Sequence, residues 1–587
     1  MLTADNDLLE KILSNNIDKQ EAIQIFESLP EAEKKQLMSK LKFKLSGNDN
    51  TGENNLTAKN RLKAVDQRDL NDRHKDFIKR LTQDYDNFVP KSKKNVIKHH
   101  SYFVDQRRAF HLIKGLKAMH FQITYVGAEG PYVYDLDGNK YIDISGDMGV
   151  NIFGHRPPFI VNAVKEALDR GIPLSGYSEM IFEATKLFSE LTGHERVLFT
   201  QSGTEAVMVA VRLARAATQK KKIVLFDGAF HGLSDAVVAM KGQDGKSLAA
   251  GPGMVQEFAD QIIILDYGDM RSLDIIEDRC DEIAGVLVEP VQSRHIYNRP
   301  IEFLRELRKL TIEKGLPLIF DEMITGFRIC PRGVQGYFNI KPDLATYGKI
   351  PGGGLPTGVI AGSAKYMDLI DGGIWNFDDD SMPKSTRAGM GGTHSQNPLK
   401  IASAHATLSE MKKRSPNPLN CDSGKSCNSC TCFQMELNKK TESMVKELNA
   451  FFIENSLPII IDYFGSLFRF RFIDSFWGLT EALFFILLRM DGIETNIQGN
   501  AFLTTAHSDE DIRKVINSVK KCLKTLIQEG FFYEAEVNET ESQEEHIQEF
   551  AKTTRVKNQA KAVGKIDNMQ IEQLKSLILR DLKKFQE

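Results

Sequence analysis

One lysine and one aspartate offer the clearest chemistry in this sequence. Lys349 lies between Gly348 and a PGGG turn, and Asp321 follows the apolar run LPLIF. A lysine amine can form an imine with a carbonyl cofactor such as pyridoxal phosphate, and a buried aspartate can keep the pyridine nitrogen of that cofactor protonated. Taken singly, a glycine-flanked lysine is more often a solvated loop charge, and an aspartate after a strand is more often a helix N-cap. The pair therefore needs support from other motifs.

A phosphate-binding turn is predicted within residues 200–215, TQSGTEAVMVAVRLAR. Apolar residues recur at helical spacing after the turn, so a helix is expected to start at Ser202, Gly203 and Thr204. Free N–H groups at a helix start favour an anion, Gly203 permits close approach, and the Thr204 hydroxyl adds a donor. An ordinary Ser/Thr cap is the alternative for this turn when it is considered alone.

Two more apolar strands end in candidate site residues. IVLFDGAFHG, residues 223–232, brings Phe230, whose flat ring could cover one face of a cofactor, although a plain core phenylalanine is the alternative. AGVLVEPVQSR, residues 284–294, delivers Glu289, Gln292 and Arg294 after a strand of the buried type. Sites in parallel sheets lie at the carboxyl ends of the strands, so these side chains are expected near Asp321.

In this order, the motifs SGTEA, FHG, VEPVQSR, FDEMITGFR, YGKIPGGGLPTG and GGTHSQNPL resemble the class III, or fold-type I, pyridoxal-phosphate aminotransferases. The resemblance runs from about Asp105 to Phe532 and is closer to the branch of glutamate-1-semialdehyde aminomutase. VEPVQSR with DLATYGK is most similar to the aminotransferase modules of polyketide and nonribosomal peptide assembly lines. The fold that this implies is α/β, with a large parallel or mixed sheet that carries the cofactor, a smaller α+β domain and helical terminal extensions.

The resemblance also implies a role for each matching position. Lys349 would form the Schiff base and then carry the proton, and Asp321 would hold the pyridinium nitrogen. A homodimer with shared sites is implied, because this family sends a phosphate ligand, here Thr393, across the subunit interface. The implied cofactor contacts are Ser202, Gly203 and Thr204 at the phosphate, Phe230 and Met323 on the two ring faces, and His231, Glu289, Asp321, Lys349 and Thr393.

Two positions depart from the family pattern. Phe230 stands where a tyrosine usually precedes His-Gly, so the phenol is absent. Arg294 corresponds to the position that supplies an amide near the cofactor phenolate oxygen in the mutase. With Gln292 it forms a candidate substrate site, because guanidinium groups bind carboxylates in bidentate fashion. A structural ion pair is the favoured interpretation of Arg294.

The chain divides into six expected segments. The ends differ most from the centre: SGNDNTGENN reads as a linker, and an acidic stretch followed by a basic one precedes the final helical pattern. The segments are a helical extension at 1–45, a linker with connecting helices at 46–100, the first part of the small domain at 101–159, the large cofactor domain at 160–365, an interface loop, cysteine-rich insert and second part of the small domain at 366–533, and a charged linker with a C-terminal helix at 534–587. The terminal helices either dock a partner or pack on their own dimer.

Four of the seven cysteines lie in the insert RSPNPLNCDSGKSCNSCTC. Cys421, Cys427, Cys430 and Cys432 supply enough thiolates for a tetrahedral zinc site, although the paired C-x2-C knuckles typical of such sites are missing. A loop of reduced free thiols is the favoured alternative, so no metal is predicted. The family resemblance does not extend to this insert.

Composition sets limits on the class of protein. An apolar fraction of 41% with 26% charged residues is ordinary for a globular enzyme, and a net charge of −3 gives no reason to expect nucleic-acid binding. No apolar run is long enough to span a membrane, and the polar N-terminus does not resemble a signal peptide. The expected location is the cytoplasm.

The predicted function is transfer of an amino group from an amino-acid donor to an aldehyde or keto acceptor. By resemblance, the acceptor would be a polyketide or fatty-acyl intermediate of secondary metabolism, either free or on a separate carrier protein. An aminomutase of the glutamate-1-semialdehyde type is the enzymatic alternative. A non-catalytic scaffold of a biosynthetic complex is the alternative of another class, and intact Lys349 and Asp321 argue against it.

Overall fold

A computed structural model describes residues 62–106, 112–242, 245–383, 388–415, 432–473, 478–495 and 499–534. Both predicted terminal extensions lie outside this part of the chain, except for residue 534. Cys421, Cys427 and Cys430 lie outside it as well, so the predicted cysteine loop keeps only Cys432 within the described residues. No helix among the described residues is both long and apolar enough to cross a membrane.

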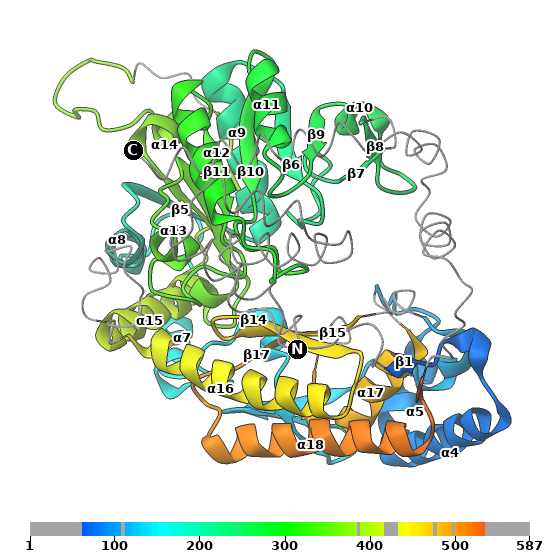
Figure 1. Cartoon of the computed structure of the whole chain (residues 1–587). Coiled ribbons are helices and arrows are strands. Elements are labelled where there is room, and N and C mark those ends of the chain that lie inside the picture. Colours follow the sequence, from blue (N-terminus) through cyan, green and yellow to red (C-terminus); the bar gives the residue numbers. More distant parts are fainter. Residues whose placement is uncertain are drawn as a thin grey trace, which may run out of the picture.

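A seven-stranded sheet forms the centre of the larger unit, in the upper half of Figure 1. Its order is β5 (Arg196–Thr200), β13 (Gly358–Gly362), β12 (Leu344–Gly348), β11 (Leu318–Asp321), β10 (Ile283–Val288), β6 (Lys222–Phe226) and β9 (Ile262–Leu265). β13 runs antiparallel to both of its neighbours, whereas the other neighbouring pairs are parallel. The expected mixed α/β sheet is therefore present.

The central strands are apolar along their whole length because helices cover both faces of the sheet. Alternate residues face opposite sides: Val286 and Phe320 join one buried cluster, while Leu287 and Ile319 join the other. α8 (Met180–Thr192), α11 (Arg271–Asp278) and α12 (Ile301–Glu313) contribute to the first cluster, and α9 (Gly203–Thr218) and α14 (Ala364–Asp371) contribute to the second.

Two smaller sheets form a second unit, in the lower half of Figure 1. One has the order β16 (Ile493–Glu494), β4 (Lys140–Asp143), β3 (Tyr132–Asp135) and β2 (Tyr125–Glu129), and the other the order β14 (Ile459–Phe464), β15 (Leu467–Phe472) and β17 (Asn500–Phe502). β3 and β4 form a hairpin, because they are consecutive strands that pair antiparallel. Strands from before residue 160 and after residue 400 thus share this unit, as expected, while the segment boundaries stay predictions.

Long helices cover these smaller sheets. They are α16 (Phe433–Glu454), α17 (Leu479–Met490) and α18 (Asp509–Gln528). Ser508 caps α18, because its Oγ accepts a hydrogen bond from the Asp511 amide at 3.1 Å. α15 (Pro398–Arg414) packs against both α7 (Pro158–Asp169) and α8, and so connects the two units.

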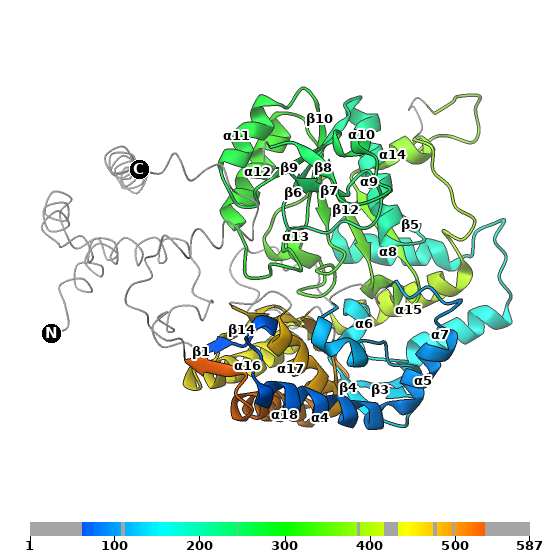
Figure 2. The ribbon, with the colours of Figure 1, turned by 90° about the vertical axis from the view of Figure 1, so that its right-hand side faces the viewer.

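The first and last described strands pair with each other, which the sequence analysis did not predict. β1 (Leu62–Ala64) runs antiparallel to β18 (Phe532–Glu534), and Figure 2 shows them together at one edge of the smaller unit. The helices α4 (Asp72–Phe88) and α5 (Pro90–His99) follow β1. The remaining short elements are η3 (Gln67–Asp69), η4 (Lys114–Met119), α6 (Gly146–Gly149), β7 (Ala239–Lys241), β8 (Ser247–Ala249), α10 (Gln256–Ala259), α13 (Gly333–Tyr337) and η5 (Ile350–Gly352).

Candidate active site

Lys349 stands at the carboxyl end of β12, where the strand changes into the short helical turn η5. Its backbone has φ 55° and ψ −100°, a conformation that costs energy for a residue with a side chain. The surrounding PGGG turn supports this geometry, since the amide of Gly352 donates to the carbonyl of Lys349 at 3.0 Å. The chain is thus held in a strained turn at the position of the predicted catalytic lysine.

Asp321 ends the neighbouring strand, β11, at the same edge of the sheet. β11 and β12 are parallel, with Asp321 opposite Thr346, so their carboxyl ends bring Asp321 and Lys349 into one region. The Asp321 side chain is only 1% exposed, and its Oδ2 lies 2.7 Å from His231 Nδ1. Its Oδ1 accepts a hydrogen bond from the Met323 amide at 3.1 Å. The carboxylate is therefore fixed in orientation from two sides.

His231 keeps one ring nitrogen unused. The side chain is buried, and among the described residues no hydrogen-bond partner is present for Nε2. Its Nδ1 faces Asp321, so a hydrogen bond there would place the proton on Nδ1. His231 is thus suited to orient the Asp321 carboxylate.

The burial of Lys349 favours a reactive amine. Burial lowers the pKa of Lys349, while the negative charges of Asp321 and Glu289 oppose that shift. Burial also raises the pKa of Glu289, and the neighbouring charge of Asp321 raises it further. A lysine with a lowered pKa is more often neutral at neutral pH, and only the neutral amine is a nucleophile.

The side-chain carboxylate of Glu289 is held at the same site by the backbone amides of two other residues. Its Oε1 accepts a hydrogen bond from the amide of Ser293 at 2.8 Å, and its Oε2 accepts one from the amide of Phe230 at 3.4 Å. The carboxylate therefore joins the loop after β10 to the FHG segment. Gln292 also connects the loop after β10 to the segment before FHG. Its side-chain Nε2 donates a hydrogen bond to the backbone carbonyl of Asp227 at 2.8 Å.

The predicted phosphate turn lies against these segments. Ser202 caps α9, because its Oγ accepts a hydrogen bond from the Glu205 amide at 3.2 Å. A Cβ atom at Gly203 would lie 2.5 Å from Met323 Sδ, so glycine allows Met323 to approach the turn. A Cβ atom at Gly232 would lie 2.6 Å from Thr204 Oγ1, which brings the FHG segment close to the same turn.

Phe230 and Arg294 contact each other, which the sequence did not indicate. The Phe230 ring is 49% exposed, and Arg294 Cζ lies 5.2 Å from its centroid. The structural ion pair favoured for Arg294 stays a prediction, whereas its contact with the Phe230 ring is present in the described part of the chain. The contact is of the cation–π type, in which a guanidinium group lies over an aromatic face.

Thr393 and Cys432 are the remaining predicted ligands that lie within the described residues. Thr393 is exposed, one residue after Gly392, whose Cβ position lies 3.3 Å from Glu205 Oε1 at the start of α9. The proposed contact with a second subunit stays a prediction. Cys432 is buried ahead of α16, and its three predicted zinc partners lie outside the described residues.

Arg328 is a residue near the site that the sequence analysis missed. Its side chain is fully buried. Nη1 lies 3.1 Å from Ser466 Oγ, and Nη2 is hydrogen-bonded to the carbonyl of Gly149. Cζ lies 4.6 Å from the centroid of the Phe502 ring. Burial lowers the pKa of Arg328 to about 9. These partners lie in both halves of the small unit, so Arg328 connects that unit to the strand end of Asp321. The motif FDEMITGFR contained it, but no local pattern indicates such distant partners.

Glu322 is a second missed residue, directly after Asp321. It is buried, and its carboxylate accepts hydrogen bonds from the amides of Gln335 at 2.9 Å and Val334 at 3.1 Å. Burial raises the pKa of Glu322 to about 7. The side chain therefore points away from Asp321 and fixes the start of α13 instead.

We expect Glu322 to make the protein less stable as pH rises from about 4.5 to about 7. The unfolded chain releases this proton near the ordinary pKa of 4.5, whereas the folded chain keeps it up to about 7. The unfolded state therefore binds fewer protons in this window, and the free energy of unfolding falls with increasing pH. Glu322→Gln removes the titration and should flatten that slope in urea unfolding curves measured at several pH values. Equal slopes in both proteins would contradict this assignment.

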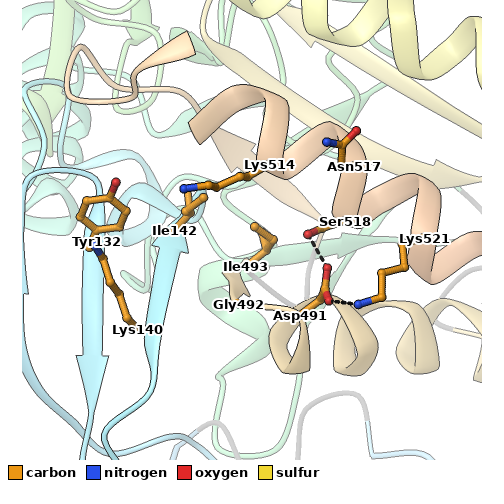
Figure 3. Close-up of a pocket in the computed structure, with 10 residues that line it drawn as sticks. All are labelled: Tyr132, Lys140, Ile142, Asp491, Gly492, Ile493, Lys514, Asn517, Ser518 and Lys521. Carbon is orange, nitrogen blue, oxygen red and sulfur yellow. Dashed lines mark hydrogen bonds and ion pairs between the residues drawn. The ribbon is translucent and has the colours of Figure 1, made fainter. Parts of the chain in front are cut away.

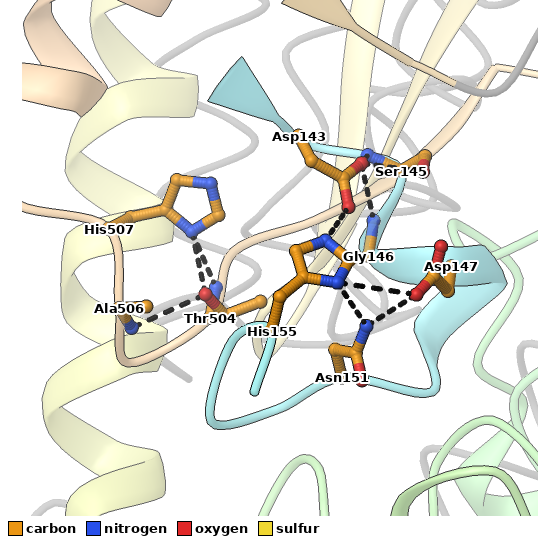
Figure 4. A network of polar contacts seen from close by, with 9 residues as sticks. All are labelled: Asp143, Ser145, Gly146, Asp147, Asn151, His155, Thr504, Ala506 and His507. Atoms are coloured by element: carbon orange, nitrogen blue, oxygen red, sulfur yellow. Dashed lines mark hydrogen bonds and ion pairs between the residues drawn. The ribbon is translucent and has the colours of Figure 1, made fainter. Parts of the chain in front are cut away.

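Two groups of polar residues lie outside the candidate active site. Figure 3 shows a cavity on the small unit, whose charged lining includes Lys514 and an ion pair between Lys521 and Asp491. Figure 4 shows His155 between two aspartates, with its Nε2 2.8 Å from Asp143 Oδ2 and its Nδ1 3.6 Å from Asp147 Oδ2. The second cluster fixes the turn of α6, where Asp147 has φ 49°.

The residues at the sheet edge fit pyridoxal phosphate. Lys349 provides the amine, Asp321 provides a buried carboxylate held by His231, and the start of α9 provides a glycine-lined turn for a phosphate. The His231 nitrogen without a partner and the half-exposed Phe230 ring lie beside them. Each chemical part of the cofactor thus has a matching group.

Comparisons with known proteins agree with this fit. The family described as aminotransferase class III matches residues 115–425. The glutamate-1-semialdehyde 2,1-aminomutase of Wigglesworthia glossinidia brevipalpis is 32% identical over 439 residues, which cover 71% of this chain and 93% of the relative. A solved transaminase with pyridoxal phosphate bound is 25% identical and has a TM-score of 0.64, with 75% of this chain and 99% of that chain covered.

The fold is also that of a solved glutamate-1-semialdehyde aminomutase from Pseudomonas aeruginosa. That likeness has a TM-score of 0.65 at 21% identity and covers 77% of this chain and 98% of the other. The expected fold-type I architecture is confirmed. This chain therefore belongs to the class III aminotransferase family and is a pyridoxal-phosphate-dependent enzyme.

Proposed function

We propose that this enzyme moves an amino group from an amino-acid donor to an aldehyde or keto acceptor. The observation that carries the proposal is the placement of Lys349 beside Asp321, whose carboxylate is held by His231 at 2.7 Å. When bound, the cofactor supplies an electron-accepting ring for the bonds around the amino-bearing carbon. The protein has to hold that ring and move one proton beside it.

Lys349 is the group that moves the proton. Its Nζ has a pKa lowered by burial, so at neutral pH it accepts a proton from the substrate carbon more readily than an exposed lysine would. Asp321 holds a proton on the ring nitrogen, and His231 orients Asp321. We assign Ser202, Gly203 and Thr204 to the phosphate, and Phe230 and Met323 to the two faces of the ring.

For the acceptor, we propose a polyketide or fatty-acyl intermediate of secondary metabolism. This part of the proposal depends on the likeness of VEPVQSR and DLATYGK to assembly-line aminotransferase modules. The first of these motifs follows β10 and includes Glu289 and Arg294 at the site, where an acceptor would be bound. The acceptor would be free or attached to a separate carrier protein.

An aminomutase is the second candidate function. The relative from Wigglesworthia glossinidia brevipalpis carries the name glutamate-1-semialdehyde 2,1-aminomutase and is covered over 93% of its length. An aminomutase would return the amino group to the same molecule, whereas an aminotransferase releases a keto product from the donor. The two reactions use the same lysine and aspartate and differ in what leaves the site.

A half-reaction separates the two candidates. The holoenzyme is mixed with single amino acids, and the visible absorbance band of the lysine-linked cofactor is followed while keto products are assayed. An aminotransferase should lose the band with one donor and release one equivalent of keto acid, and an acceptor should then restore the band. Turnover of glutamate 1-semialdehyde to 5-aminolevulinate, without any keto acid from other donors, would replace the proposal with the aminomutase.

We further propose a homodimer whose sites are shared through Thr393. Lys349→Ala and Thr393→Ala subunits are each expected to be weak alone, because each lacks one part of a site. In a mixed dimer, one site would contain both changes and the other would contain neither, so activity should partly return. Purified mixed dimers without any recovery would contradict sharing.

A further inference from the structure

The helix α15 carries a buried lysine, Lys400, that the proposed mechanism does not use. Lys400 is only 3% exposed, and its Nζ donates hydrogen bonds to the carbonyl of Thr200 at 2.7 Å and to Gln201 Oε1 at 3.4 Å. Thr200 is the last residue of β5, and Gln201 directly precedes Ser202, the cap of α9. Lys400 therefore holds the strand end from which the predicted phosphate turn begins.

The same side of α15 holds the turn that contains Lys349. Ser403 follows Lys400 by three positions, so the two side chains lie close together on the helix. The buried Ser403 Oγ donates a hydrogen bond to the carbonyl of Gly352 at 2.8 Å, and a Cβ atom at Gly353 would lie 2.6 Å from this Oγ. The helix thus contacts both turns of the candidate site, and Figure 2 shows it where the two units meet.

The positive charge of Lys400 is unusual at a buried position. Lysine is rarely buried unless its charge is balanced, yet both oxygens that accept hydrogen bonds from Lys400 Nζ are neutral. Burial lowers the pKa of Lys400 to about 8, and the charge of Glu205 opposes that shift. At pH 7 the amine therefore still carries its proton. An anion bound nearby would stabilise this charge.

Glu205 adds a negative charge at the same turn. It lies in the first turn of α9, and its Oε2 accepts a hydrogen bond from the amide of Gln201 at 2.5 Å. A phosphate at the start of α9 would be attracted by the helix dipole and repelled by this carboxylate. Lys400 contacts the side chain of the same Gln201, so its charge is placed to offset the repulsion.

We propose that Lys400 is a positioning residue that strengthens binding of the cofactor phosphate. Its hydrogen bonds to Thr200 and Gln201 fix the segment that leads into the turn, and its charge favours a phosphate dianion there. The amine does not have to touch the phosphate, because charges in a protein interior act on each other over several ångströms. The inference rests on the proposed function, in which the start of α9 takes the phosphate.

The test compares two ligands that differ only in the phosphate. The full-length protein is freed of cofactor by dialysis and titrated with pyridoxal phosphate and with pyridoxal, and the visible absorbance band gives a Kd for each. The Kd of pyridoxal divided by the Kd of pyridoxal phosphate measures the preference for the phosphate. Lys400→Met keeps the apolar stem without the charge, and it should reduce the preference by about tenfold. The Kd of pyridoxal itself should change by less than about twofold.

Two further variants separate the charge of Lys400 from its hydrogen bonds. Lys400→Gln keeps a donor for the Thr200 carbonyl but has no charge, so it should also lose most of the preference; it replaces Lys400→Met if that variant does not fold. Lys400→Arg keeps the charge and should retain more of the preference than either neutral variant.

Ser403→Ala is the matched control, because it removes a buried polar group from the same side of α15. Its hydrogen bond goes to the turn of Lys349 and not to the phosphate turn. Any change in the two Kd values should therefore be by the same factor, so that the preference stays that of the wild-type protein.

The outcomes separate this inference from the proposed function. Equal binding of both ligands by the wild-type protein would contradict the phosphate turn and this inference together. A wild-type preference that persists in Lys400→Met and Lys400→Gln would overturn the role of Lys400 alone. Equal weakening of both ligands in these variants would show a general structural role and would overturn it too. If no amino group is transferred in the half-reaction, the proposed reaction fails, whereas a preference lost only in the neutral Lys400 variants still supports the inference.

Discussion

Lys349→Ala is expected to reduce kcat by about 10⁴-fold or more. The change removes both the amine that holds the cofactor and the group that moves the proton, and such groups dominate the rate of covalent catalysis. The lysine stands in a strained turn at the end of β12 with a pKa lowered by burial, and alanine leaves no amine at this position. Single-turnover kinetics with the best donor measures the loss.

The control is Lys309→Ala, on the exposed surface of α12, where the lysine forms an ion pair with Glu306. It should leave both kcat and the visible absorbance band unchanged. If Lys349→Ala retained the band and turned over at more than about a hundredth of the wild-type rate, Lys349 would not be the catalytic lysine.

Asp321→Asn is expected to reduce kcat/KM by about 10²- to 10³-fold. The amide has nearly the same shape but lacks the charge that keeps the ring nitrogen protonated, and losses of this size follow removal of one preorganised electrostatic contact. The change also makes the hydrogen-bond partner of His231 Nδ1, 2.7 Å away in the wild-type protein, a neutral amide in place of a carboxylate. Steady-state kinetics and cofactor dissociation by dialysis measure the two consequences.

Asp278→Asn provides the comparison, because Asp278 is exposed at the end of α11. It should behave as the wild-type enzyme in both measurements. An Asp321→Asn enzyme with an unchanged kcat/KM would show that the carboxylate does not act on the cofactor.

The sequence was sufficient for those parts of the fold that local patterns determine. The apolar strands before Asp321 and Lys349, the hairpin of β3 and β4, and the Ser508 cap all follow from residues close together in the chain. Parallel strands end at one sheet edge, so the same patterns placed both catalytic candidates in one region before any contact was known.

Contacts between distant segments could not be predicted in this way. The pairing of β1 with β18, the bond between His231 and Asp321, and the burial of Arg328 between two parts of the small unit join residues about 90 to 470 positions apart. The contact of Arg294 with the Phe230 ring was likewise not indicated by the sequence.

The most direct test of the central claim is to identify the residue that carries the cofactor. The holoenzyme is reduced with borohydride, digested, and analysed by peptide mass spectrometry, with Lys349→Ala treated in parallel. We expect the phosphopyridoxyl group on the peptide that contains Lys349 and on no other peptide, and we expect no label at comparable occupancy in the variant. A label on another lysine, or a protein that binds no pyridoxal phosphate, would contradict the assignment of this site.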